Sequence, residues 1–272
     1  MQNVELLENT FLKFKPFITL PDIEHGLAFS PSSAYGENYV WIGFGNSIFC
    51  FLRDPSTYPT TTSPYPELQS LHQIRYKQKA DWWKSDMNVA DLAITKDGSR
   101  IFVADSTNGF VHYFDTQNIP ANIDDQYSPI MESYGAYSIS ICDDYVYWLG
   151  DCDPNDGRQN PYPTPSVLLH SLNLTQSGGY GYHPWIPIPK GKYPSLMKVV
   201  AAKNYAIVVS PGDTLAYVVA GAPFNFQDTG ANILQTIKGS FLQDLTIMPD
   251  NSRLIIAALD GVEVWNANLV PE

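Results

Sequence analysis

The sequence predicts a single all-β domain spanning residues 1–272, a small β-propeller of about five four-stranded blades. Three observations predict it: apolar strands bounded by turn residues, a three-strand unit that recurs along the chain, and an unusual composition. Aromatic side chains make up 13% of the residues, and they suit the half-buried surface of a sheet. Charged residues make up only 16%, which argues against a disordered chain.

The recurring unit is clearest in residues 88–116 and 241–267. Each segment reads as an apolar strand, a turn, a Ser-Arg pair, a second strand, a short Asp/Gly turn and a third strand. The first turns, at residues 97–98 and 250–251, hold Asp, Gly and Asn, which tolerate the positive φ of tight hairpins. Three weaker copies begin at residues 26, 136 and 195. The spacing of the copies, ~45 to 65 residues, is close to the ~40 to 50 of propeller blades.

Each copy supplies three strands, so a four-stranded blade needs one more. Apolar segments between the copies are candidates for this strand, at residues 68–76, 128–133, 183–188 and 232–237. The last copy has no strand after it. We therefore expect the N-terminal strand 10–20 (Thr10 to Leu20) to complete the last blade and close the ring. A closed ring leaves no long sheet edge exposed to aggregation.

One segment also admits a helix. Between residues 66 and 84, Leu68, Leu71 and Ile74 have helical spacing, but the same residues fit a strand followed by a loop. The register of the repeat needs a strand there, so we favour the strand.

The charge balance limits the partners. The formal net charge is −12, with 16 basic residues in 272. A nucleic-acid partner is therefore not expected, because binding to phosphate needs clustered cations. An anionic membrane is not expected for the same reason. The N-terminus lacks the basic and apolar regions of a signal peptide, so we expect synthesis in the cytoplasm without one.

Motifs for catalysis and for cofactors were not found. The sequence has no Walker loop, no nucleophile elbow and no zinc-protease motif, and no cofactor is predicted. Asp91 and Asp244 occupy the same repeat position, where the other copies have Gly26, Ser138 and Met197. Glycoside hydrolysis needs two carboxylates. The favoured interpretation is that each Asp caps nearby backbone N–H groups instead.

No metal site is predicted. The five histidines are scattered and form no i, i+4 pair of the kind that binds zinc. Residues 151–157 read DCDPNDG, and alternating oxygen ligands suit Ca²⁺. The glycine falls one place late for a calcium loop, so a solvated acidic turn is the favoured interpretation.

A ligand-binding surface is predicted where three loops meet. Residues 75–84 concentrate basic side chains beside Trp82 and Trp83, and aromatic residues with cations are typical of binding hot spots. The alternative is that one Trp packs between blades and the lysines are solvated. In a propeller, loops 81–88, 105–109 and 151–165 should cluster on one face. The predicted ligand-binding residues are Trp82, Trp83, Asp151, Asp153 and Asp156.

Several of these segments resemble a known family. The strings GLAFSPS, DLAITKDGSRIFVAD and GVEVWN resemble degenerate WD40 and YVTN-like β-propeller repeats. The first blade, residues 20–44, is similar to propeller repeats of tailed-bacteriophage structural proteins. The resemblance implies a toroidal shape and binding of proteins or glycans, and it says little about chemistry.

The expected function is therefore a non-catalytic interaction module, a structural or host-recognition component of a bacteriophage particle, located in the virion. Its partner would be another protein or a surface glycan. Two alternatives stay open. One is a carbohydrate-binding or glycoside-hydrolase-like propeller, and the other is a cellular WD40-like scaffold.

Overall fold

The structure is a computed structural model of the chain. It describes a set of segments that together hold every strand named below. They are residues 32–35, 39–52, 72–76, 88–107, 109–116, 122–123, 131–132, 134–151, 166–175, 185–189, 191, 193, 197–202, 204–211, 214–222, 224, 233–238, 242–247, 253–258 and 261–266. All statements about the structure concern these residues.

The described strands form five sheets that, apart from the short strand β8, follow one another along the chain. Sheet 1 contains β1 (Ser32–Tyr35), β2 (Tyr39–Phe44), β3 (Ser47–Leu52), β4 (His72–Tyr76) and β8 (Asn122–Ile123). Sheet 2 contains β5 (Val89–Ile94), β6 (Arg100–Asp105), β7 (Phe110–Asp115) and β9 (Met131–Glu132). Sheet 3 contains β10 (Tyr134–Cys142), β11 (Tyr145–Asp151), β12 (Ser166–Asn173) and β13 (Trp185–Pro189). Sheet 4 contains β14 (Lys198–Ala201), β15 (Tyr205–Val209), β16 (Leu215–Ala220) and β17 (Ile233–Lys238). Sheet 5 contains β18 (Leu242–Ile247), β19 (Arg253–Ala258) and β20 (Gly261–Asn266).

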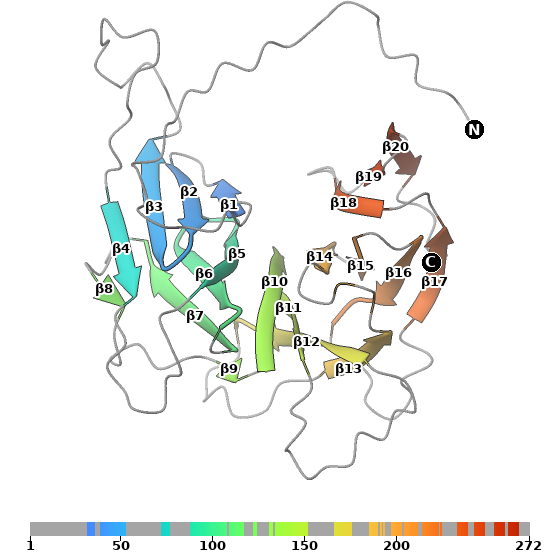
Figure 1. Cartoon of the computed structure of the whole chain (residues 1–272), viewed down its shortest axis with the longest axis horizontal. Coiled ribbons are helices and arrows are strands. Elements are labelled where there is room, and N and C mark those ends of the chain that lie inside the picture. The colour runs from blue at the N-terminus through green and yellow to red at the C-terminus, as the bar shows by residue number, and fades with distance from the viewer. Residues whose placement is uncertain are drawn as a thin grey trace, which may run out of the picture.

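The five sheets are arranged like blades around a common centre (Figure 1). The first strand of each sheet, β1, β5, β10, β14 or β18, lies innermost, and the later strands lie progressively outward. Contacts join the innermost strands in order, from β1 to β5, β10, β14 and β18. The arc is open between β1 and β18 in Figure 1. The fold is therefore all-β and of the propeller type.

An apolar core lies between each pair of consecutive sheets. Strands alternate their side chains between two faces, so each inner sheet contributes one face to the preceding core and one to the following core. The prominent side chains are Trp41 and Phe114 between sheets 1 and 2, Phe102 and Trp148 between sheets 2 and 3, Tyr147 and Phe224 between sheets 3 and 4, and Ile207 and Leu254 between sheets 4 and 5. Each such side chain contributes roughly 1.5–3 kcal/mol when fully buried. Packing between sheets therefore holds the arc together.

Tight turns connect the strands where the sequence places Gly, Asn and Asp. The β2–β3 hairpin turns at Gly45-Asn46, with a φ of 55° at Gly45. In the turn before β6, Gly98 has a φ of 69°, as predicted for residues 97–98. Asp143 has a φ of 50° in the β10–β11 turn, a conformation that Asp tolerates better than most residues. The turn at residues 250–251 lies outside the described residues.

Most of the predicted strands are confirmed. Residues 72–76 form β4, so the strand was the right choice over the helix. Strands β9, β13 and β17 lie in the three other predicted segments. The described inner strand of sheet 1 begins at Ser32, and the string GLAFSP before it lies outside the described residues. The predicted N-terminal strand 10–20 also lies outside them. In the described segments, no helix is long and apolar enough to cross a bilayer.

Candidate functional site

The innermost strands share one position that the register makes equivalent in all five sheets. It is the residue opposite Gly43 in sheet 1, Ala104 in sheet 2, Leu149 in sheet 3, Val209 in sheet 4 and Ala257 in sheet 5. We call these residues the inner ring. They are Ser32, Asp91, Ser138, Lys198 and Asp244.

A β-bulge precedes the inner-ring residue in sheets 2, 3 and 5. The pairing register shifts between Val89 and Asp91, between Ala136 and Ser138, and between Leu242 and Asp244. A bulge bends its strand and redirects the neighbouring side chains. The strands of these three sheets therefore share an irregularity just before the inner-ring position.

Asp91 joins two sheets through its carboxylate. Its Oδ2 accepts hydrogen bonds from the Ser138 hydroxyl at 2.8 Å and from the Ile139 N–H at 3.0 Å, both on β10. Its Oδ1 accepts the Leu92 N–H at 3.0 Å. The bond from Leu92 confirms the predicted capping of a local N–H group by Asp91. The bonds to sheet 3 were not expected.

Opposing effects act on the pKa of Asp91. Desolvation raises the pKa of this carboxyl, although the residue as a whole is only half-buried. The positive charge of Lys198 and the hydrogen bonds from sheet 3 oppose that rise without cancelling it. Because Lys198 acts on Asp91 from two sheets away, both charges belong to one central environment.

The hydrogen-bonded chain continues from sheet 3 to sheet 4. Ser138 Oγ accepts the Val199 N–H at 3.1 Å, and Ser140 Oγ accepts the Ala201 N–H at 3.0 Å. The strand pairing also corrects the repeat alignment that was made from the sequence. The sequence alignment put Gly26 and Met197 at the position of Asp91. The pairings of Ser32 with Gly43 and of Lys198 with Val209 put Ser32 and Lys198 there instead.

Asp244 holds the same position in sheet 5 but has fewer partners. Its Oδ1 accepts the Leu245 N–H at 2.8 Å, which again confirms the expected local cap. The residue is exposed, and no donor to its Oδ2 is found among the described residues. Asp91 and Asp244 thus share a backbone position but differ in environment.

The two buried histidines occupy equivalent places on β7 and β12. His112 lies opposite Val103 and contacts the Phe110 ring edge-on, and His170 stacks on Trp148 with ring centroids 4.7 Å apart. Burial lowers the pKa of His112 to about 3, so this imidazole is neutral in the folded protein at pH 7. The described segments contain no cluster of three potential metal-ligating side chains.

One end of sheet 2 collects turn and loop residues. Val89 donates its N–H to the carbonyl of Gly45 in the β2–β3 turn at 2.7 Å. Asn88 donates its N–H to Asp105 Oδ1 at 3.2 Å and its Nδ2 to Ser106 Oγ at 3.0 Å. We call this end, formed by these five residues and the remainder of the loop 105–109, the loop face. The last residue of loop 81–88 therefore lies beside loop 105–109.

The predicted ligand-binding residues fall mostly outside the described segments. Trp82, Trp83, Asp153 and Asp156 lie outside them. Asp151 is the last residue of β11, where it pairs with Tyr134 and Val167. This end of β11 corresponds to the Asp105 end of β6, so the loop that follows Asp151 starts on the same side as the loop face.

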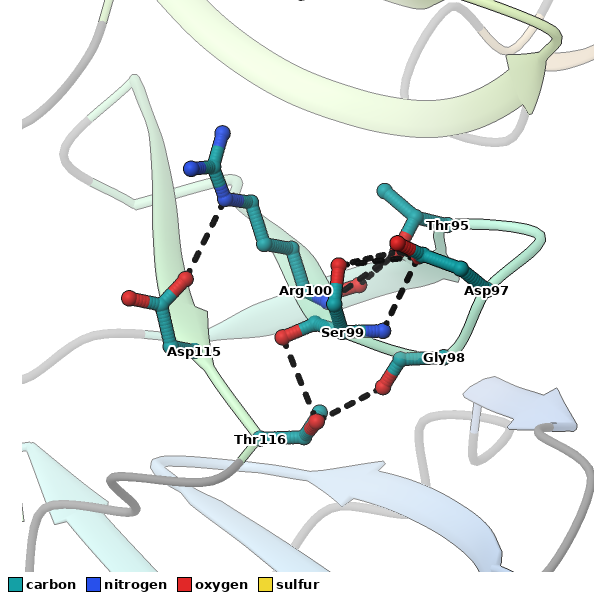
Figure 2. Close-up of polar contacts among 7 residues, drawn as sticks. All are labelled: Thr95, Asp97, Gly98, Ser99, Arg100, Asp115 and Thr116. Atoms are coloured by element: carbon teal, nitrogen blue, oxygen red, sulfur yellow. Dashed lines mark hydrogen bonds and ion pairs between the residues drawn. The ribbon is translucent and has the colours of Figure 1, made fainter.

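The opposite end of sheet 2 carries a compact polar turn (Figure 2). Asp97 Oδ1 accepts hydrogen bonds from Thr95 Oγ1 at 2.6 Å, from the Ser99 N–H at 3.0 Å and from Ser99 Oγ at 2.8 Å. These bonds, the one from Thr95 first, lower the pKa of Asp97 to about 2. Thr116 Oγ1 closes the turn by donating to the Gly98 carbonyl at 2.6 Å. The polar groups bond to one another, which indicates a structural role for this turn.

Comparisons with known proteins agree with the fold. No family model matches the chain. No curated protein matches it either. Solved structures do match. A functionally unknown protein from Desulfotomaculum acetoxidans is 17% identical with a TM-score of 0.56, and the match covers 87% of this chain and 64% of that one.

Two further structures share the same architecture. The WD40 domain of Neurospora crassa Pan2 is 10% identical with a TM-score of 0.51, over 87% of this chain and 62% of that one. A chain of Kuenenia stuttgartiensis hydrazine synthase is 11% identical with a TM-score of 0.54, over 88% of this chain and 65% of that one. At these identities the similarity shows the fold alone. The chain spans less than two thirds of the length of each of these structures.

Proposed function

We propose that the protein is a non-catalytic interaction module that binds another protein through its loop face. The observation that carries the proposal is that the polar groups at the centre of the fold and those of the loop face have different roles. The buried inner-ring carboxylate of Asp91 is engaged in bonds that join sheets 2 and 3. The loop face places the last residue of loop 81–88 beside loop 105–109. Loops held by a rigid scaffold are where binding residues concentrate.

Trp82 and Trp83 are the proposed anchors of this surface, with Asp151, Asp153 and Asp156 supplying polar contacts. The two tryptophans belong to the predicted loop 81–88, whose last residue, Asn88, is bonded to Asp105 and Ser106. The predicted loop 151–165, which contains the acidic residues, begins at Asp151, the last residue of β11, at the corresponding end of sheet 3. Large aromatic residues dominate binding energy at protein interfaces.

The test compares two variants of the full chain. Trp82→Ala/Trp83→Ala should weaken binding to an identified, purified partner by at least about tenfold, or ~1.4 kcal/mol. Leu234→Ala is the matched control, because Leu234 is 46% exposed on β17, the outermost strand of sheet 4. Its affinity should equal that of wild type. Equal affinities for all three proteins would refute the proposed surface.

The biological setting is a separate part of the proposal. A role in a bacteriophage particle is supported by the sequence resemblance to phage propeller repeats. A cellular scaffold is equally supported, because WD40 domains are among the structural neighbours. Mass spectrometry of purified particles against co-purification with host proteins separates the two. A glycan-array signal that depends on Trp82 and Trp83 would instead favour the carbohydrate-binding alternative.

We also propose that the ring closes and that Thr10–Leu20 forms the fourth strand of sheet 5. The described part of sheet 5 has three strands, whereas each other sheet has at least four. Removal of residues 1–20 should lower the unfolding temperature, and removal of residues 1–9 should leave it near the wild-type value. Equal unfolding temperatures for both truncations would refute this strand assignment.

A further inference from the structure

The forward faces of sheets 4 and 5 carry the same apolar pattern but differ in exposure. By forward face we mean the face turned toward the following sheet. In sheet 4 it consists of Ile207, Val209, Ala216 and Val218, and each is at most 2% exposed because sheet 5 covers it. The register places four counterparts in sheet 5: Ile255, Ala257, Val262 and Val264. Val262 is 65% exposed and Val264 is 44% exposed. The forward face of sheet 5 thus has the composition of a buried surface, and its two valines on β20 are exposed.

The inner ring provides a polar contact between consecutive sheets. Asp91 accepts the N–H of Ile139, which is the residue after the inner-ring position of sheet 3. Ser138 accepts the N–H of Val199, which is the residue after the inner-ring position of sheet 4. The rule is that an inner-ring acceptor binds the next N–H of the following sheet. Lys198 has no lone pair and cannot follow this rule.

Asp244 has the acceptor that the rule requires, but among the described strands no sheet follows sheet 5 along the chain. Its strand has the same bulge as the strand of Asp91, and its Oδ1 makes the same local bond, to Leu245, that Asp91 makes to Leu92. In Asp91 the other oxygen, Oδ2, binds the next sheet. In Asp244 this oxygen has no donor among the described residues, and the residue is exposed.

Sheet 1 provides the matching donors by register. Ser32 lies opposite Gly43, at the place where Ser138 lies opposite Leu149. Ser32 and Ser33 therefore correspond to Ser138 and Ile139, the residues that supply a hydroxyl and an N–H to Asp91. Figure 1 shows that β1 and β18 flank the open side of the arc.

We propose that Asp244 is the acceptor that closes the ring, and that its partner is the first strand of its own chain. Its Oδ2 receives the backbone N–H of Ser33, in the same way that Asp91 receives the N–H of Ile139. The docking of sheet 1 also covers Val262 and Val264. The inference rests on the proposed closure of the ring and is independent of the loop face.

The first experiment measures amide hydrogen exchange at Ser33 in the full chain. The wild-type amide should be protected, and Asp244→Ala should accelerate its exchange by at least about tenfold, as expected when a strand N–H loses its acceptor. Asp91→Ala is the matched control and should have the same effect at Ile139, where the structure shows the bond. Rapid exchange of Ser33 in the wild type, or no response to Asp244→Ala, would overturn the proposal.

The second experiment does not depend on the stability of Asp244→Ala. In a background with Cys50, Cys142 and Cys152 replaced by Ser or Ala, Ser32→Cys/Asp244→Cys should form an intramolecular disulfide. The pair Asp91→Cys/Ser138→Cys is the positive control. A disulfide between two copies of the chain, or none while the control pair links, would contradict the proposal.

The two proposals about closure can be told apart. Removal of residues 1–20 could destabilise the protein while Asp244→Ala leaves the amide exchange of Ser33 unchanged. That result would support closure through the N-terminal strand and refute the contact of Asp244. Conversely, Asp244→Ala could accelerate the amide exchange of Ser33 while the truncation leaves the unfolding temperature unchanged. That result would support the contact of Asp244 and refute the N-terminal strand assignment.

Discussion

Asp91 and Asp97 lie six residues apart, one within β5 and one in the turn that follows it, and they have opposite environments. Asp91 has its carboxylate against sheet 3, and desolvation raises its pKa. Asp97 is exposed, and bonds within its own turn lower its pKa to about 2. Each carboxylate accepts three hydrogen bonds. The number of hydrogen bonds therefore does not explain why the two pKa values shift in opposite directions. The loss of solvent around the carboxylate of Asp91 does.

The difference also sets opposite dependences of stability on pH. A carboxyl with a raised folded pKa contributes stability below its unfolded pKa, near 3.8, and loses it as pH rises through the folded pKa. A carboxyl with a lowered folded pKa contributes stability above 3.8 and loses it as pH falls toward about 2. Asp91 thus opposes, and Asp97 reinforces, the fall in stability on acidification.

The largest effect is expected from Asp91→Ala. The substitution leaves the Ser138 hydroxyl and the Ile139 N–H without their acceptor between sheets 2 and 3, and an unsatisfied buried donor costs about 1–3 kcal/mol. The free energy of unfolding should fall by about 3 kcal/mol, measured by urea denaturation. A loss below about 0.5 kcal/mol would mean that the contact between the sheets contributes nothing.

A double-mutant cycle isolates the bond between the two side chains. Ser138→Ala removes the hydroxyl but keeps the Ile139 N–H, and it also removes the acceptor of Val199. The coupling energy between Asp91→Ala and Ser138→Ala should be about 1–2 kcal/mol, since the two groups are in direct contact. Additive effects would show that the serine acts only through sheet 4.

The comparison of the two aspartates also separates what the sequence could predict from what it could not. The turn of Asp97 is visible in the string TKDGSR, because each of its bonds joins residues within a few positions. The local cap of Asp91 was predictable for the same reason. Its bonds to Ser138 and Ile139 cross 47 and 48 positions, and no local pattern encodes them.

Register explains the other differences. The strands of sheets 2, 3 and 5 have a bulged residue before the inner-ring position, whereas the described pairing of sheet 4 has no such shift. Strings aligned by apolar pattern alone can therefore slip by one position between sheet 4 and the others. This is how Met197, rather than Lys198, was placed beside Asp91 in the sequence alignment. The short parallel pairing of β8 with β4 lacks a sequence signal as well, because β8 is only two residues long.

The next largest effect on the free energy of unfolding is expected for the buried imidazole of His112. Burial lowers its pKa to about 3, from about 6.5 when unfolded, so the unfolded chain binds more protons between these values. This contribution to stability is complete above pH 6.5 and declines as pH falls. It should decrease by about 2 kcal/mol from pH 7 to pH 5.

Urea denaturation of wild type and His112→Phe across this pH range tests the prediction. The variant keeps an aromatic ring in the core and removes the titrating group. From pH 7 to pH 5 its free energy of unfolding should therefore fall by about 2 kcal/mol less than that of the wild type. Identical pH profiles for both proteins would exclude His112 as the source.

A smaller effect is expected from Asp97→Ala. The substitution removes three bonds within an exposed turn but disturbs no packing between sheets. Amide exchange at Ser99 should become faster, because its N–H loses its acceptor, and the loss of global stability should be smaller than for Asp91→Ala. A loss equal to that of Asp91→Ala would contradict the distinction between a local turn and a contact that joins sheets.

The smallest effect is expected at the ion pair beside this turn. Arg100 Nε lies 3.1 Å from Asp115 Oδ1, and the two side chains are 40% and 52% exposed (Figure 2). An exposed pair contributes about 0–1 kcal/mol, so Asp115→Ala should cost less than about 0.5 kcal/mol and less still at high salt. Arg100 also lies over the Tyr113 ring, with its guanidinium carbon 5.5 Å from the centroid.

Arg100→Ala should therefore cost more than Asp115→Ala, by about 0.5–1 kcal/mol, because it removes the cation–π contact as well as the charge pair. The excess should persist when salt is raised, whereas the effect of Asp115→Ala should fade, since a packed ring contact is screened less than an exposed ion pair. Equal losses for the two variants at every salt concentration would show that the aromatic contact adds nothing, and that the charge pair alone accounts for the arginine at this position.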